Sequence, residues 1–359
     1  MKLEIRDICF RKIQLENNYL KLFQGFLLGV LILSGAAETA WGQYPGFAEN
    51  PLITEYDVDE SWPKRPENIA KFGWVSGMAL DKEGNIWLFN KGEDPVQCYQ
   101  PDGTFVRTWG KGDFQDPHHI RIDHEGSIWV ADFGLHLVQK YTPDGELLFQ
   151  LGEKGVSGED QTHFNRPTDM VISPAGDIFV TDGYGNRRVV HFDSEGKFVK
   201  AWGTYGTGRG QFVLPHAIVM DNEGLLYVAD RNSGRIMIFN QAGELQDEWS
   251  NIIMPWGMSI NYKGDLWVCG SSPHWWKRGD KYPEFKDQLF LRFSTSGRLQ
   301  QMWTIPLGDR DHRETIKPGE AAGIHCIVED KEGNLYVGDI YNENAQKFRP
   351  VTKRTPETP

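Results

Sequence analysis

The sequence predicts an all-β fold: a six-bladed β-propeller whose last blade is closed by a strand from the N-terminal side. Three observations predict it. A strand–turn–strand unit recurs six times, its turn glycines are spaced like propeller blades, and no long segment with helical periodicity follows residue 45. The composition agrees, because 39 glycines and 19 prolines suit many tight turns.

Each copy of the recurring unit predicts a strand, a tight turn with glycine, and a second strand. The copies are MALDKEGNIWL (78–88), IRIDHEGSIWV (120–130), MVISPAGDIFV (170–180), IVMDNEGLLYV (218–228), MSINYKGDLWV (258–268) and IVEDKEGNLYV (327–337). Their turn glycines, Gly84, Gly126, Gly176, Gly224, Gly264 and Gly333, lie 42, 50, 48, 40 and 69 residues apart. The first four intervals are those of four-stranded propeller blades, and six copies are enough to close a ring.

Most copies are followed by two further strand-like segments, for example QKYTPDGELLFQLG after the second copy. The sixth copy ends near Arg349 without a fourth strand, and LITEYDV (52–58) could supply it from upstream. Pairing of the two chain ends would also remove exposed edge strands. We therefore predict the propeller at 62–350, a linker and closing strand at 41–61, and a C-terminal tail at 351–359.

The long fifth interval contains two polar or aromatic insertions, at 271–287 and 306–323. Functional residues often lie on such loops above a rigid scaffold. Two interpretations stay open: the insertions form a rim around the channel mouth, or they are solvated surface loops.

Residues 1–40 predict an export signal or a membrane anchor. Basic residues precede the apolar run 26–33, and small residues follow it. An apolar core of about a dozen residues is shorter than the roughly 20 that span a bilayer, which favours cleavage near Ala37 or Ala40 over an anchor. We expect an exported protein, extracellular or periplasmic, that contacts a membrane only if this segment is retained.

The charge and the cysteines narrow the classes of partner. A formal net charge of −12 repels phosphate backbones, and no run rich in lysine or arginine occurs, so the sequence argues against nucleic acid. The four cysteines are scattered without CxxC spacing and predict no disulfide framework. We expect a monomer that binds a small-molecule or peptide substrate.

The innermost strand of each propeller blade lines the central channel, so equivalent repeat positions are neighbours in space. Just before this strand, the six units carry Ser76, His118, Thr168, His216, Trp256 and His325. A single histidine in such a loop would be interpreted as a hydrogen-bonded packing residue and not as a metal ligand. Histidines in units two, four and six, however, surround the axis evenly and predict a metal site with three nitrogen ligands. Three histidines with an open fourth position are typical of catalytic zinc.

An aspartate recurs at the end of the second strand in four units, which predicts a turn-capping role for Asp132, Asp182, Asp230 and Asp339. The residues that follow this position differ between units. Among these differing residues are Lys91, Tyr184 and Arg231. We predict that they project from loops near the channel mouth. A tyrosine beside a metal and cations is expected to lose its phenolic proton more easily. Surface stacking or packing is the alternative interpretation of each.

The phrases PTD, DGY-x-N-x-R, PH and ADR-x-x-GR occur between residues 161 and 236. By these phrases the chain resembles NHL-repeat propellers and, within them, the peptidyl-α-hydroxyglycine α-amidating lyases, over about 62–348. The resemblance implies that His118, His216 and His325 are zinc ligands. It also implies that Tyr184 is the catalytic base and that Arg231 is an active-site arginine.

Several positions depart from that family. Lys91 stands where the family has an arginine, and only arginine offers a planar bidentate fork to a carboxylate, so the substrate preference is in question. Gly323 stands where a methionine lines the family's pocket. The family's paired cysteines are replaced by Asn165, Gly185, Tyr227 and Ile238.

A structural calcium ion is a further expectation from the resemblance. Cys326 stands where the family has an aspartate that helps to hold this ion, which removes one donor. The backbone carbonyls of Met78 and Ile120 remain as candidate ligands.

Together these features predict a zinc-dependent lyase that cleaves an N-acyl α-hydroxyglycine-type carbinolamide to an amide and glyoxylate, with Lys91 and Arg231 holding the substrate carboxylate. One alternative is a non-catalytic exported NHL propeller that binds a protein or carbohydrate partner. Another is metal-dependent hydrolysis of an ester or lactone, although such propellers usually surround calcium with carboxylates and amides.

Overall fold

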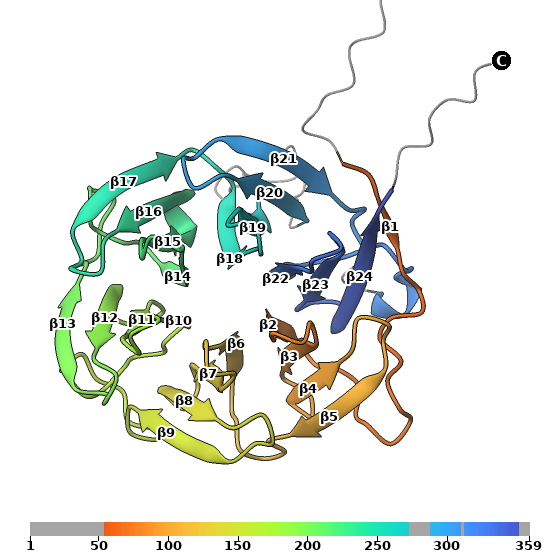
Figure 1. The fold of residues 1–359 in the computed structure, drawn as a ribbon, viewed down its shortest axis with the longest axis horizontal. Coiled ribbons are helices and arrows are strands. Elements are labelled where there is room, and N and C mark those ends of the chain that lie inside the picture. Colours follow the sequence, from red (N-terminus) through yellow and green to blue (C-terminus); the bar gives the residue numbers. More distant parts are fainter. Residues whose placement is uncertain (1–53, 273–287, 310–311, 352–359) are drawn as a thin grey trace, which may run out of the picture. The chain divides into compact units, whose positions relative to one another are not determined.

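The computed structural model describes residues 54–272, 288–309 and 312–351. These residues form six four-stranded sheets arranged in a ring around a common axis (Figure 1), which confirms the predicted all-β six-bladed propeller. The predicted export segment 1–40, most of the insertion 271–287 and most of the tail 351–359 lie outside the described residues. Within the described ranges, no helix is long and apolar enough to cross a membrane.

The strands follow the repeat units in order, and within a blade neighbouring strands pair in antiparallel register. Blades one and two contain β2 (Val75–Leu80), β3 (Ile86–Asn90), β4 (Val96–Tyr99), β5 (Phe105–Trp109), β6 (Pro117–Ile122), β7 (Ile128–Asp132), β8 (Leu137–Tyr141) and β9 (Leu147–Leu151). Blades three and four contain β10 (Asp169–Ile172), β11 (Ile178–Asp182), β12 (Arg188–Phe192), β13 (Phe198–Trp202), β14 (Pro215–Met220), β15 (Leu226–Asp230), β16 (Arg235–Phe239) and β17 (Leu245–Ser250).

Blade five contains β18 (Met254–Ile260), β19 (Leu266–Ser271), β20 (Leu289–Phe293) and β21 (Leu299–Thr304), and blade six contains β22 (Ile324–Glu329), β23 (Leu335–Asp339), β24 (Asn344–Pro350) and β1 (Tyr56–Val58). The described residues also form two short 3₁₀ helices, η1 (Arg231–Ser233) and η3 (Arg313–Thr315). The second predicted insertion therefore carries η3 but no extra blade in its described part.

The first turn of each blade explains why the unit repeats. Gly84 has φ +86, a left-handed backbone that glycine adopts at little cost. Asp81 accepts the backbone N–H of Asn85 at 2.8 Å, and its second oxygen accepts Trp87 Nε1–H at 2.9 Å. The same carboxylate-to-aromatic bond recurs in three other blades, between Asp123 and Trp129, Asp221 and Tyr227, and Asp330 and Tyr336. The aspartate thus fixes the turn and the ring of the second strand together.

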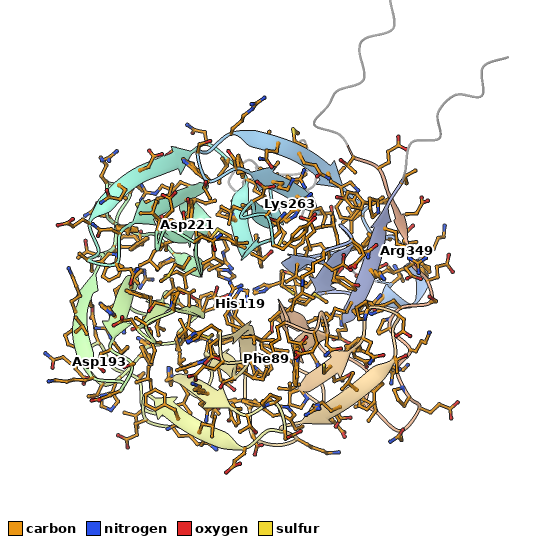
Figure 2. All side chains as sticks on the ribbon, in the orientation of Figure 1. Phe89, His119, Asp193, Asp221, Lys263 and Arg349 are labelled. Atoms are coloured by element: carbon orange, nitrogen blue, oxygen red, sulfur yellow. The ribbon has the colours of Figure 1, made fainter. Side chains whose placement is uncertain are left out.

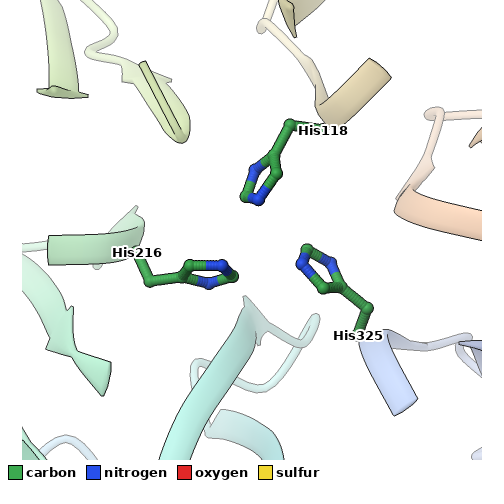
Figure 3. A group of neighbouring side chains, drawn as sticks. All are labelled: His118, His216 and His325. Atoms are coloured by element: carbon green, nitrogen blue, oxygen red, sulfur yellow. The ribbon is translucent and has the colours of Figure 1, made fainter. Parts of the chain in front are cut away.

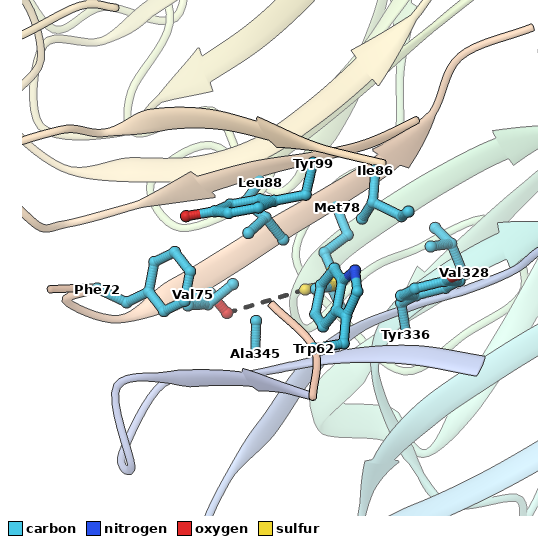
Figure 4. Packing of buried hydrophobic residues seen from close by; sticks show 11 residues of the cluster. Trp62, Phe72, Val75, Met78, Ile86, Leu88, Tyr99, Val328, Tyr336 and Ala345 are labelled. Atoms are coloured by element: carbon cyan, nitrogen blue, oxygen red, sulfur yellow. Dashed lines mark hydrogen bonds between the residues drawn. The ribbon is translucent and has the colours of Figure 1, made fainter. Parts of the chain in front are cut away.

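The closing strand joins the two ends of the chain, as predicted. β1 pairs with β24 in antiparallel register, Tyr56 opposite Pro350 and Val58 opposite Phe348. Trp62 follows β1 and fills the junction between the last blade and the first. Its ring packs edge-on against Tyr336 of β23 and lies in a buried cluster with side chains of β2, β3 and β4 (Figure 4). The ring closes, therefore, through both a strand pair and an apolar contact.

Replacing Trp62 with alanine should lower the free energy of unfolding by about 3–5 kcal/mol, the usual cost of removing a buried tryptophan side chain. The side chain is only 4% exposed, and its Nε1–H donates to the Gln100 carbonyl at 3.1 Å. Urea unfolding of the full chain measures the loss. Leu148→Ala on the exposed strand β9 is the control and should change stability by less than about 0.5 kcal/mol. Equal effects of the two substitutions would contradict the assigned role of Trp62.

Candidate metal centre

The three predicted ligands lie at the inner strands of alternate blades: His118 on β6, His216 on β14 and His325 on β22. The strand register shifts around each of them, so each is the extra residue of a β-bulge. Bulges re-aim side chains, and these three imidazoles point toward one another (Figure 3). The same shift recurs at Ser76 and Trp256 in blades one and five. The repeat position found in the sequence is therefore also a distinct backbone position.

The three rings form a nearly equilateral cluster. Their centroids are 4.8 Å apart for His118 and His216, 4.8 Å for His118 and His325, and 5.0 Å for His216 and His325. Their candidate ligand atoms lie within 4.8 Å of one another, and all three residues are buried. In the described part of the chain, this is the only group of three or more histidine, cysteine or carboxylate side chains placed to hold a metal ion.

Hydrogen bonds from the far side of each ring decide which nitrogen can bind a metal. Each Nδ1 contacts a carbonyl oxygen of the following blade: His118 that of Thr168 at 2.5 Å, His216 that of Trp256 at 2.5 Å, and His325 that of Ser76 at 2.6 Å. Because a carbonyl only accepts, each Nδ1 carries the proton and each Nε2 keeps a free lone pair. Blades one, three and five thus orient the ligands of blades six, two and four.

Electrostatics also keeps the cluster neutral. Burial lowers the pKa of His118 and His216 well below the ordinary histidine value and lowers the pKa of His325 to about 3. Neutral imidazoles with a second nitrogen bound to a backbone carbonyl are the form in which histidine ligates metals. This donor set therefore fits a divalent metal ion such as zinc.

The Tyr184 hydroxyl lies between two of these nitrogens. It is 3.1 Å from His118 Nε2 and 3.0 Å from His216 Nε2. Tyr184 has one proton to donate, so it can satisfy one of the two lone pairs and leaves the other facing its oxygen. Such a surplus of acceptors is the environment that a bound cation completes. The structure therefore brings the predicted tyrosine to the centre of the site.

Two opposing effects act on the pKa of the Tyr184 hydroxyl, and the sequence prediction considered only one of them. Burial raises the pKa of the Tyr184 hydroxyl, and the charges of Arg231 and Arg166 lower that pKa by less. Positive charge thus acts in the predicted direction, but in the protein alone burial outweighs it.

Arg231 begins η1 directly after β15 and reaches the same region. Its guanidinium lies 4.5 Å from the Trp256 ring centre and 5.7 Å from that of Tyr184. Its Nε–H donates to the side chain of Asn232 at 3.1 Å. Arg231 therefore lies beside both Tyr184 and Trp256.

Lys91 lies at the channel mouth, but with a partner that the sequence did not suggest. Its ammonium is 2.6 Å from the Asp116 carboxylate and 4.7 Å from the ring centres of both Trp74 and Phe133. Phe133 also packs edge-on against Tyr184. Phe133 occupies in blade two the position after the second strand that singled out Lys91, so the repeat alignment contained the signal. Asp116 occupies the repeat position two residues before His118, where every other unit carries a different residue type, so no pattern singled it out.

The four recurring aspartates act as turn caps, as predicted. Asp132, for example, accepts backbone N–H groups of Gln115, Gly134 and Leu135 at 2.7, 2.9 and 2.9 Å. Asp182 and Asp230 also pair with an arginine each, Arg188 and Arg235. They therefore hold the loops with the differing residues that follow them, rather than contacting the metal cluster.

A fourth histidine faces the channel beside the cluster. His119 lies at the centre of the ring (Figure 2), 5.3 Å from the His118 ring and 5.4 Å from the His325 ring. It is 2% exposed, and neither of its nitrogens has a hydrogen-bond partner among the described residues. Two residues on, Arg121 forms an ion pair with Asp169 and donates to the Met258 carbonyl at 3.0 Å.

The calcium expectation finds little support here. Met258 and Ile218 occupy the same repeat position as Met78 and Ile120. The Arg121 guanidinium donates to the Met258 carbonyl at 3.0 Å and to the Ile218 carbonyl at 3.3 Å. A fixed positive charge thus already occupies part of this ring of carbonyls. Burial also raises the pKa of the Cys326 thiol well above its usual value, and a neutral thiol is a poor ligand for calcium.

Comparisons with known proteins agree with this architecture. A family model described as a 6-bladed beta-propeller matches residues 160–255. The chain is 32% identical over 352 residues to a peptidyl-glycine alpha-amidating monooxygenase of Mus musculus, which covers 87% of this chain and 34% of that protein. The chain therefore spans about a third of the length of such relatives.

Two relatives are matched over most of their own length. A Caenorhabditis elegans protein, described as a probable peptidyl-alpha-hydroxyglycine alpha-amidating lyase, is 30% identical over 61% of this chain and 69% of its own. NHL repeat-containing protein 3 of Homo sapiens is 27% identical over 84% of this chain and 86% of its own. Among solved structures, a gluconolactonase of Xanthomonas campestris shares the fold, with TM-score 0.56, 14% identity, and coverage of 85% of this chain and 99% of that one.

Proposed function

Because the chain belongs to the family of peptidyl-α-hydroxyglycine α-amidating lyases, we propose that it is a metal-dependent carbon–nitrogen lyase. Its substrate would be an N-acyl α-hydroxyglycine-type carbinolamide, and its products an amide and glyoxylate. The observation that carries the proposal is the Tyr184 hydroxyl at 3.1 and 3.0 Å from two converging Nε2 atoms, those of His118 and His216. An acid–base group and a neutral ligand set thus meet at one point.

The residues of the chain supply the proton transfers. A zinc ion held by His118, His216 and His325 would act as a Lewis acid toward the substrate hydroxyl. Tyr184, once deprotonated, accepts the hydroxyl proton as the C–N bond breaks and a C=O bond forms. The bonding electron pair stays on the amide nitrogen, to which Tyr184 returns the proton. Arg231 places positive charge beside the substrate carboxylate.

A binding role is the second candidate, and one comparison favours it. NHL repeat-containing protein 3 matches the chain over most of its length, and its name states no reaction. In this alternative, the channel face would hold a protein or carbohydrate partner without chemical turnover. The two candidates differ in one measurable property, which is product formation.

Glyoxylate release from α-hydroxyhippurate tests the proposal. The purified full chain should bind one zinc ion and release glyoxylate, a chelator should abolish the release, and added zinc should restore it. Calcium is the control and should not restore activity, because three imidazoles are poor ligands for a hard cation. A zinc-loaded chain that releases no glyoxylate would contradict the lyase proposal and favour the binding role.

We also propose that residues 1–40 direct export, so that the chain would meet its substrate outside the cytoplasm. The charged, apolar and small-residue order of this segment supports the proposal. N-terminal sequencing of protein recovered from outside the cytoplasm would test it, with cleavage near Ala37 or Ala40 as the expected result. Retention of the whole protein in the cytoplasm would contradict it.

A further inference from the structure

We propose that the substrate carboxylate is held by Arg166 and Arg231, on the Tyr184 side of the channel mouth, while Asp116 neutralises Lys91 and removes it from this role. The inference rests on the proposed function and adds a substrate-binding residue, Arg166, to it.

Lys91 is the least available of the cations at the mouth. Its ammonium and the Asp116 carboxylate are 2.6 Å apart, and their side chains are only 22% and 30% exposed. The rings of Trp74 and Phe133 flank the ammonium at 4.7 Å each. Ion pairs shielded from water in this way are stronger than exposed pairs. An incoming carboxylate would have to compete with Asp116 for Lys91.

The backbone around Asp116 fixes this pair in place. The Asp116 N–H donates to the Asp132 carboxylate at 3.0 Å, and the Phe133 N–H donates to the Asp116 carbonyl at 3.2 Å. A side chain at Gly134 would bring its Cβ to 2.7 Å from the Asp116 carboxylate, so a glycine there leaves room for this group. Asp116 is therefore held toward Lys91 by the same loop that carries Phe133.

Arg166 also lies against the Phe133 ring, but it is not neutralised. Its guanidinium is 5.0 Å from the Phe133 ring centre, and within the described ranges no carboxylate lies at ion-pair distance from it. Its backbone has φ +65, which is costly for a residue other than glycine, and such residues tend to cluster at active sites and ligand clamps. A free cation is thus placed beside the site at some conformational cost.

The backbone of Arg166 is tied to the loop of the proposed base. Its carbonyl accepts the Tyr184 N–H at 3.4 Å, and its own N–H donates to His136 Nδ1 at 3.0 Å. Arg231 approaches Tyr184 from the next blade, likewise without a carboxylate partner among the described residues. The charges of two guanidinium groups, each of which matches a carboxylate in shape and charge, therefore act on Tyr184, since both lower the pKa of its hydroxyl.

Binding of hippurate, which has the carboxylate but lacks the hydroxyl, tests the assignment without turnover. For the full chain, titration calorimetry should show that Arg166→Gln weakens hippurate binding about tenfold, the usual effect of one charge-assisted hydrogen bond. Arg166→Lys should recover part of this loss. The paired replacement Lys91→Met with Asp116→Asn should change the affinity less than about twofold, because it removes no net charge. Asp116→Asn alone should tighten binding, because it frees Lys91.

The uncharged amide of hippurate is the control ligand, and its affinity should be the same in all variants if they fold alike. Unchanged hippurate binding by Arg166→Gln, a tenfold loss in the paired replacement, or no binding by the unmodified chain would each overturn the assignment. The glyoxylate assay is separate. Hippurate binding through Arg166 without glyoxylate release would contradict the lyase proposal and leave the charge assignment standing.

Discussion

Tyr184→Phe should lower the rate of glyoxylate release by about 10³-fold, within the range that general acid–base catalysis contributes. The substitution removes only the hydroxyl, which lies at 3.1 and 3.0 Å from the Nε2 atoms of His118 and His216. The ring would keep its packing against Phe133, so the fold and the bound metal should be unchanged. Steady-state kinetics with α-hydroxyhippurate, together with zinc analysis, measures both properties.

Tyr262→Phe provides the matched control, because that tyrosine is 52% exposed and lies away from the channel. It should leave the rate within about twofold of the unmodified protein. If Tyr184→Phe keeps more than a tenth of the activity while binding zinc normally, Tyr184 does not transfer the proton. Loss of zinc together with activity would instead mean that the hydroxyl supports the ligands rather than the reaction.

His216→Ala should remove stoichiometric zinc binding and with it at least about 10³-fold of the activity, because two histidines are too few for a stable catalytic zinc site. Zinc should also stop protecting the variant against thermal unfolding, since a ligand stabilises only the state that binds it. Zinc content and the melting temperature, each measured with and without added zinc, report these effects independently of turnover.

His119→Gln is the control for His216→Ala, because it removes a neighbouring histidine that is not a predicted zinc ligand. His119 is as buried as its neighbour His118, but its nitrogens have no carbonyl partner to orient them among the described residues. This variant should retain one zinc per chain. If His119→Gln loses zinc and His216→Ala keeps it, the ligand set inferred from alternate blades is wrong.

The repeat made most of the fold readable from the sequence. The six turn glycines located the blades because a left-handed turn accepts little else, and the closing strand followed from a missing fourth strand in the last blade. The aspartate found in four of the six turns was less informative in sequence. Its bond to the aromatic ring six residues on becomes visible only when the turn has folded.

The metal cluster could also be predicted from the sequence, because equivalent positions in a ring of repeats are neighbours in space. His118, His216 and His325 do lie together. The backbone carbonyls of Ser76, Thr168 and Trp256 that orient these histidines could not be predicted, because every residue type carries the same backbone acceptor. Nor could the pairing of Lys91 with Asp116 be predicted. Asp116, Arg166 and Arg121 stand in single blades, and their directions depend on bulges and loop conformations that a repeat pattern does not encode.

The closing strand pair has a consequence for mechanical load. The two ends of the described chain lie side by side, since the Val351 N–H donates to the Glu55 carbonyl at 2.9 Å. Tension applied through both ends would break the Tyr56–Pro350 pair first and then the following residue pairs one after another. The strands would peel apart and would not shear all their pairs at once. The seam of the ring is therefore its weakest point under pulling, and opening it would expose the buried side chains of Phe348, opposite Val58, and then of Trp62.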